Sequence, residues 1–106
     1  MSTYTVIADL ATHSPIPEDG ILSRTIHDDD QIRVIFFGFA VGEELSEHTA
    51  AMPALLQMIS GEAKITLGEE TIEAKPGAWI HMPANLAHSI NATTPVVLLL
   101  TLLKGQ

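Results

Sequence analysis

The sequence predicts an all-β fold, an antiparallel barrel or sandwich. Short runs rich in β-branched and aromatic residues recur along its 106 residues. Gly, Pro, Asn and Asp stand between these runs, and segments with helical periodicity are scarce. Regularly spaced short strands separated by turn residues are typical of all-β sandwiches and barrels.

Eight runs are predicted as strands, at residues 4–7, 21–26, 31–41, 55–59, 63–67, 71–74, 78–82 and 96–103. Gly68 predicts a tight hairpin after the fifth run, because glycine adopts positive φ without steric cost. Lys75-Pro76-Gly77 predicts another turn, since proline fixes φ. Pro53 argues against a continuous helix over residues 42–57. We expect one compact β domain over residues 1–106.

The composition is unusually apolar for so short a chain. Hydrophobic residues make up 46% of it, and the mean hydropathy is +0.26. A small domain buries a limited share of its surface, so excess apolar surface is typically covered by a second subunit. We therefore expect a homodimer, the commonest symmetric assembly.

The charge balance excludes several partners. Thirteen acidic and five basic side chains give a formal net charge of −8. An acidic surface repels phosphate backbones, so neither nucleic acid nor a membrane is expected as a partner. The acidic run Asp28-Asp29-Asp30 lacks the regular carboxylate spacing of a calcium loop and is predicted to be a solvated turn.

The absence of cysteine excludes disulfides, thiolate metal sites and cysteine nucleophiles. The first residues lack a basic region followed by a long apolar core, the pattern of a signal peptide. The longest apolar run, within residues 96–103, is too short to span a bilayer. A cytoplasmic protein is therefore expected.

Two segments have regularly spaced glycine, histidine and proline residues. One runs over residues 42–61 and the other over residues 77–91. They resemble the two signature motifs of the cupin superfamily. The positions that match these motifs are Gly42, His48, Gly61, Gly77, Pro83 and His88.

The same segments depart from the family pattern at four positions. The second histidine of the first motif falls on Ala50, and its glutamate falls on Ala54. The glycine of the second motif falls on Asn85, which can also adopt a left-handed conformation. The final asparagine falls on Ala92, with Asn91 one place earlier. Two of the family's four metal ligands are therefore replaced by alanine.

The resemblance implies a small antiparallel β-barrel with jelly-roll topology, also called a double-stranded β-helix. Cupins of this size often form dimers. The family holds a divalent transition metal, usually iron, manganese, nickel, copper or zinc, through three histidines and a glutamate inside the barrel. In this chain the metal ligands implied by the resemblance are His48 and His88.

Strand geometry extends this expectation to a pocket. Alternate side chains of an extended strand share a face, so His48, Ala50, Met52 and Ala54 are expected to line one side of the barrel. His88 from the second motif completes the predicted ligand pocket. Its walls are apolar and its two imidazoles are its polar groups, as in many small-molecule sites.

Two side chains are candidates for a third metal ligand. Gln57 lies on the opposite face from Ala54 unless a bulge intervenes. His81 shares a face with Trp79, and alternation does not orient it because both faces of its run are apolar. Two imidazoles suit zinc, nickel, copper or iron. Structural zinc sites use four protein ligands and catalytic ones three, so two ligands predict weak binding.

Three functions remain open on these residues. The first is a binding module that holds a small, mostly apolar molecule anchored by His48 and His88. The second is a metal-dependent enzyme of the dioxygenase or isomerase type that uses the reduced two-histidine site. The third is an interaction protein with no surviving site. The sequence assigns no catalytic residue and names no substrate.

Overall fold

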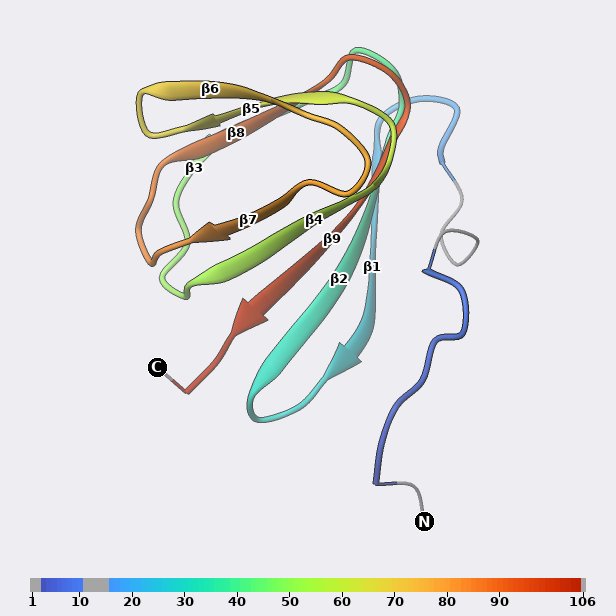
Figure 1. Ribbon diagram of the computed structural model, residues 1–106, viewed down its shortest axis with the longest axis vertical. Coiled ribbons are helices and arrows are strands. Elements are labelled where there is room, and N and C mark those ends of the chain that lie inside the picture. The colour runs from blue at the N-terminus through green and yellow to red at the C-terminus, as the bar shows by residue number, and fades with distance from the viewer. Residues whose placement is uncertain (1–2, 11–15, 106) are drawn as a thin grey trace.

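The computed structural model describes residues 3–10 and 16–105 of the chain (Figure 1). These residues form β1 (Ile21–Asp28), β2 (Ile32–Phe39), β3 (Glu44–His48), β4 (Ala54–Ser60), β5 (Ala63–Leu67), β6 (Glu70–Ala74), β7 (Trp79–Met82), β8 (His88–Ala92) and β9 (Val96–Leu103). None of the described residues belongs to a helix long and apolar enough to cross a membrane. The prediction of an all-β fold is confirmed.

The strands form two antiparallel sheets. One has the order β1-β2-β9-β4-β7, and the other has the order β3-β8-β5-β6. The chain changes sheet repeatedly, for example between β2 and β3 and again between β3 and β4 (Figure 1). Such alternation between two antiparallel sheets is the jelly-roll arrangement.

The core lies between the two sheets because each strand presents alternate side chains to it. Strand β4 shows this directly, since Ala54, Leu56 and Met58 are buried whereas Gln57 is exposed. The buried core cluster consists of Phe39, Ala54, Leu56, Met58, Ala63, Ile65, Ala74, Ile80, Met82, Ile90, Ala92, Val96 and Leu98.

Both predicted turns are present. Leu67 pairs with Glu70 across the hairpin between β5 and β6, and Gly68 has a φ of 63° at the first loop position. Between β6 and β7, the amide of Ala78 donates to the Lys75 carbonyl at 2.9 Å. Gly77 has a φ of 92° in that turn, so the Pro-Gly pair occupies the positions that its two residues favour.

Seven of the eight predicted runs overlap observed strands. The prediction for residues 4–7 is wrong, because Tyr4 and Val6 are exposed there and the segment forms no strand. Strands β3 and β8 were not predicted, since both are short and mix polar with apolar residues. A strand is defined by its neighbours as much as by its own residues, which explains both errors.

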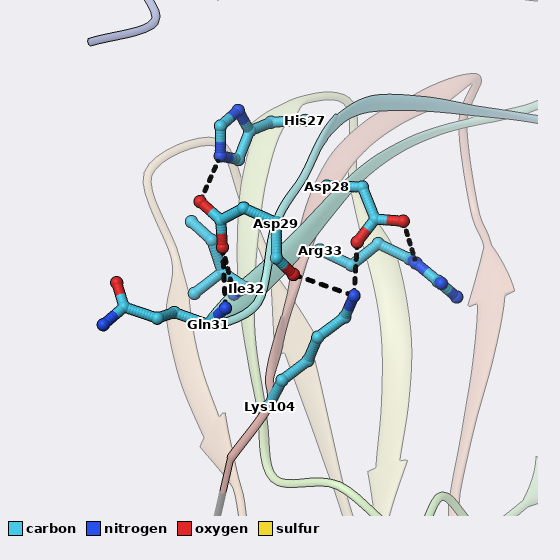
Figure 2. Close-up of polar contacts among 7 residues, drawn as sticks. All are labelled: His27, Asp28, Asp29, Gln31, Ile32, Arg33 and Lys104. Carbon is cyan, nitrogen blue, oxygen red and sulfur yellow. Dashed lines mark hydrogen bonds and ion pairs between the residues drawn. The ribbon is translucent and has the colours of Figure 1, made fainter. Parts of the chain in front are cut away.

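The acidic run forms the turn between β1 and β2, in agreement with the prediction (Figure 2). The Asp29 carboxylate accepts hydrogen bonds from the amides of Gln31 at 2.7 Å and Ile32 at 2.9 Å. His27 Nε2 lies 2.7 Å from the other carboxylate oxygen of Asp29. These contacts close the turn. The hydrogen bond from the Ile32 amide, followed by those from His27 and the Gln31 amide, lowers the pKa of Asp29 to about 2.

Lys104 fastens this turn to the end of β9 (Figure 2). Its Nζ atom donates to the Asp28 carboxylate and, at 2.9 Å, to the Asp29 carbonyl. Arg33 donates through Nε to the second carboxylate oxygen of Asp28 at 3.2 Å. The hydrogen bond from Lys104, together with Arg33, lowers the pKa of Asp28. Cations and backbone amides thus satisfy both carboxylates, which leaves no arrangement typical of a calcium loop.

Replacing Asp29 by asparagine is expected to destabilise the protein at neutral pH and to matter less in acid. The folded-state pKa of about 2 lies below the ordinary 3.8, so the carboxylate contributes stability above 3.8 that is lost as the pH falls toward 2. Urea unfolding of both proteins at about pH 7, 4 and 2.5 measures this convergence. Asp30→Asn is the control, and an Asp29→Asn difference independent of pH would contradict the prediction.

Candidate functional site

The two motif histidines lie opposite each other on neighbouring strands. His48 is the last residue of β3 and His88 is the first of β8, and the two pair across the antiparallel ladder. A register shift between Leu45 and His48 ends the regular pairing of β3 just before this point. The ring centroids are 4.1 Å apart with an interplanar angle of 59°. His88 is buried with 8% of its surface exposed, and His48 is exposed, so the pair extends from the surface into the barrel.

Backbone contacts fix the tautomer of both rings. His48 Nδ1 lies 2.9 Å from the carbonyl oxygen of Ser46, and His88 Nδ1 lies 2.9 Å from that of Leu86. A carbonyl oxygen accepts hydrogen bonds but cannot donate them, so each Nδ1 carries the proton. In the neutral ring, Nε2 then bears a lone pair and is the nitrogen left for a ligand.

The two motifs are joined by a backbone contact beside the pair. After His48 the chain leaves β3, and residues 49–53 cross to β4 in the other sheet. The amide of Asn85 donates to the Ala50 carbonyl at 2.8 Å within this crossing. Asn85 has a φ of 68°, the left-handed conformation expected at the position of the family's glycine. The contact holds the segment before His88 against the segment after His48.

Two small cavities adjoin the histidine pair. Each has a volume of about 50 Å³. The outer one is lined by His48, Ala50, Met52, Ala54, Met82, Pro83, Leu86, His88, Leu100 and Leu102. The inner one is lined by Phe37, Leu45, His48, Leu56, Met82, His88, Ile90, Leu98 and Leu100. Both histidines line both cavities, so the pair stands at their junction.

The five residues predicted for the ligand pocket all line the outer cavity. The backbone arrangement that brings them together differs from the expected one, because Ala50 and Met52 do not continue strand β3. They lie in the crossing between the sheets, and Ala54 begins β4. The residues therefore meet at one cavity through a sheet change and not through regular alternation along one strand.

Neither candidate for a third metal ligand is brought to the pair. Gln57 and His81 are exposed and lie on the outer face of the five-stranded sheet, where Gln57 pairs with Trp79 and His81 with Leu55. The side chains that point inward from these strands are their neighbours, such as Leu56 and Met82. Strand alternation thus directs Gln57 and His81 away from both cavities.

The donor set does not fit the family's closed metal site. His48 and His88 offer two Nε2 atoms, whereas Ala50 and Ala54 present methyl groups at the positions where the family supplies further ligands. Within residues 3–10 and 16–105, no group of three or more His, Asp or Glu side chains is arranged to hold a metal ion. Structural and catalytic zinc sites use four and three protein ligands, so these two nitrogens suit weak coordination.

Several lining residues were not predicted from the sequence. Leu100 and Leu102 of β9 line the outer cavity, and Phe37 of β2 lines the inner one. Residues 96–103 are apolar at every position except Thr101, so the sequence shows no alternation there. An apolar run buried on both faces does not reveal which face meets the cavity.

The sequence profile of the cupin domain family matches residues 35–102. This stretch contains both motifs and both histidines. No protein of curated function matches the chain in sequence. The profile match therefore identifies a family and no particular activity.

Solved structures with the same architecture include proteins from three bacteria. A conserved protein of unknown function from Streptococcus pyogenes has a TM-score of 0.85 and 29% identity, over 97% of this chain and 90% of its own. A cupin superfamily protein from Desulfitobacterium hafniense has a TM-score of 0.84 and 28% identity, over 90% and 87%. A cupin 2 conserved barrel domain protein from Leptotrichia buccalis has a TM-score of 0.83 and 28% identity, over 90% and 46%.

Proposed function

The chain belongs to the cupin domain family, and on that premise we propose that it binds a small, mostly apolar molecule inside the barrel. His48 and His88 are the proposed polar anchors of this ligand. The observation that carries the proposal is the position of this pair at the junction of two cavities with otherwise apolar side chains. A few convergent polar groups in an apolar cavity are typical of small-molecule sites.

The cavity volumes limit the size of the proposed ligand. Each measures about 50 Å³, whereas pockets for drug-sized ligands measure roughly 300–1,000 Å³. A molecule with a handful of heavy atoms suits this space. His48 is exposed, which supports entry of the ligand from the outer cavity past this residue.

Replacing both His48 and His88 by alanine is expected to weaken binding of small hydroxyl-bearing molecules by roughly fivefold to tenfold. The reason is the loss of the hydrogen bond to an imidazole Nε2 atom, which contributes about 1 kcal/mol. Chemical-shift titration by nuclear magnetic resonance with short alcohols and phenols measures the affinities. His81→Ala is the matched control, because it removes an exposed imidazole from the outer face. Unchanged binding in the double variant would contradict the assigned anchors.

A divalent transition metal held by the two Nε2 atoms is part of the same proposal, as a weakly bound species. The site offers such an ion two neutral imidazoles and no carboxylate, whether it is zinc, nickel, iron, manganese or copper. Elemental analysis of protein purified without a histidine tag should then give well under one metal per chain. Near-stoichiometric metal that survives dialysis against a chelator would favour the metal-dependent enzyme instead.

We propose the outer face of the five-stranded sheet as the surface of a homodimer. Its apolar residues include Leu22, which is 42% exposed, and Trp79, which is 61% exposed. The outward positions paired across the five strands carry no Asp or Glu, although the chain has 13 acidic residues. Two copies of this face can therefore meet without the repulsion that a net charge of −8 imposes elsewhere.

Light scattering after size exclusion is expected to give twice the mass of one chain at micromolar concentration. Trp79→Glu should shift the protein toward monomer, because it places a carboxylate in an apolar contact. Thr71→Glu adds the same charge at an exposed strand position of the other sheet and should leave the dimer intact. A monomeric wild-type protein would overturn the proposed dimer.

A further inference from the structure

The histidine pair presents acceptors alone to the cavities. Both Nδ1–H groups are engaged by the carbonyl oxygens of Ser46 and Leu86, each at 2.9 Å. In the neutral rings both Nε2 atoms are therefore acceptors. If one ring were protonated at Nδ1 and the other at Nε2, the pair would present one donor and one acceptor. The backbone contacts therefore determine what the site can recognise.

Neither cavity contains another polar side chain. Besides the two histidines, the lining consists of Ala, Leu, Ile, Met, Pro and Phe side chains. No Lys, Arg, Ser, Thr, Asn or Gln side chain lines either cavity to donate a hydrogen bond to a ligand oxygen. The polar recognition available to a ligand thus comes from two lone pairs in apolar surroundings.

We infer that the ligand is a small alcohol or phenol, whose hydroxyl donates its one hydrogen bond to the Nε2 atom of His48 or of His88. A carboxylate or an ether oxygen would bring lone pairs against lone pairs at this point. An ammonium group could donate, but burying its charge among aliphatic side chains without a counter-ion costs far more than burying a hydroxyl. This inference rests on the proposed small-molecule binding and names its ligand class.

The test compares three small molecules of similar size with the wild-type protein at about pH 8, where imidazole in water is neutral. 1-Butanol offers a hydroxyl donor, methyl propyl ether offers acceptors alone, and butyrate is an anion. Chemical-shift titration should give roughly fivefold to tenfold tighter binding of the alcohol than of the ether, the effect of one hydrogen bond. Butyrate should bind more weakly than both. Nitrogen-15 shifts of the imidazoles should report protonated Nδ1 in both rings.

Two variants separate the preference for a hydroxyl from the effect of the cavity's shape. His48→Leu and His88→Leu should each reduce the difference between alcohol and ether, whereas His81→Ala on the outer face should preserve it. Equal binding of alcohol and ether by the wild type would overturn the inference and leave the proposed binding function standing. Tightest binding of butyrate would likewise overturn it. Failure of all three molecules to bind would overturn both.

Discussion

Replacing Gly61 by alanine is expected to destabilise the protein severely, by roughly 2–5 kcal/mol from strain and overpacking together. An added Cβ atom at Gly61 would lie 2.0 Å from the Pro95 carbonyl oxygen and 2.9 Å from the Val96 Cα atom. Both contacts are with backbone, so no side-chain rotation relieves them. Gly61 also has a φ of 81°, which alanine adopts at a cost of about 1–2 kcal/mol.

Gly42→Ala is the matched control for this effect. Gly42 has a φ of 78°, but nothing lies within 4 Å of an added Cβ atom. Its cost should therefore be the conformational part alone, about 1–2 kcal/mol. Urea unfolding measured on both variants separates strain from overlap. Equal losses at the two positions would show that the backbone around Pro95 yields, contrary to the prediction.

Replacing Met82 by alanine is expected to cost about 2–5 kcal/mol, the usual range for truncating a buried methionine. Met82 is 3% exposed, belongs to the core cluster and lines both cavities. Its truncation should join the two volumes of about 50 Å³ into one larger space. Apolar cavities near 150 Å³ bind benzene, so the variant should bind benzene better than the wild type does.

Met52→Ala is the control for the Met82 variant. Met52 is half-buried and lines the outer cavity but not the inner one. Its truncation should cost less stability and should not unite the cavities. Urea unfolding and titration with benzene measure the two effects. Similar costs, or similar gains in benzene affinity, would contradict the prediction that truncating Met82 joins the two cavities.

Much of the fold could be predicted because turn residues and alternation act locally. Gly68 and the Pro76-Gly77 pair stand where the chain reverses, and β5 and β9 have the predicted bounds. The two unpredicted strands, β3 and β8, are those that carry the histidines. The sequence of each contains polar residues because its outward side chains are exposed to solvent. Each is recognised as a strand only through its pairing with neighbouring strands.

Five of the residues that line the candidate site could be predicted from the sequence. The proton positions of the histidines and the direction of His81 could not. Motif spacing brought His48 and His88 together across the sequence. The proton positions depend on the carbonyls of Ser46 and Leu86, two residues before each ring, and therefore on the local backbone path. The outward direction of His81 depends on which face of an apolar strand meets the core. A strand that is apolar on both faces does not encode that direction.

Strand β9 lies at the centre of the five-stranded sheet, between β2 and β4. During synthesis, β2 and β4 leave the ribosome well before the strand that separates them, so each exposes one unpaired backbone edge. Unpaired edges of apolar strands attract other strands, including those of neighbouring nascent chains. The sheet can close only after residue 103 has emerged, so until then the edges of β2 and β4 stay open to pairing with other chains.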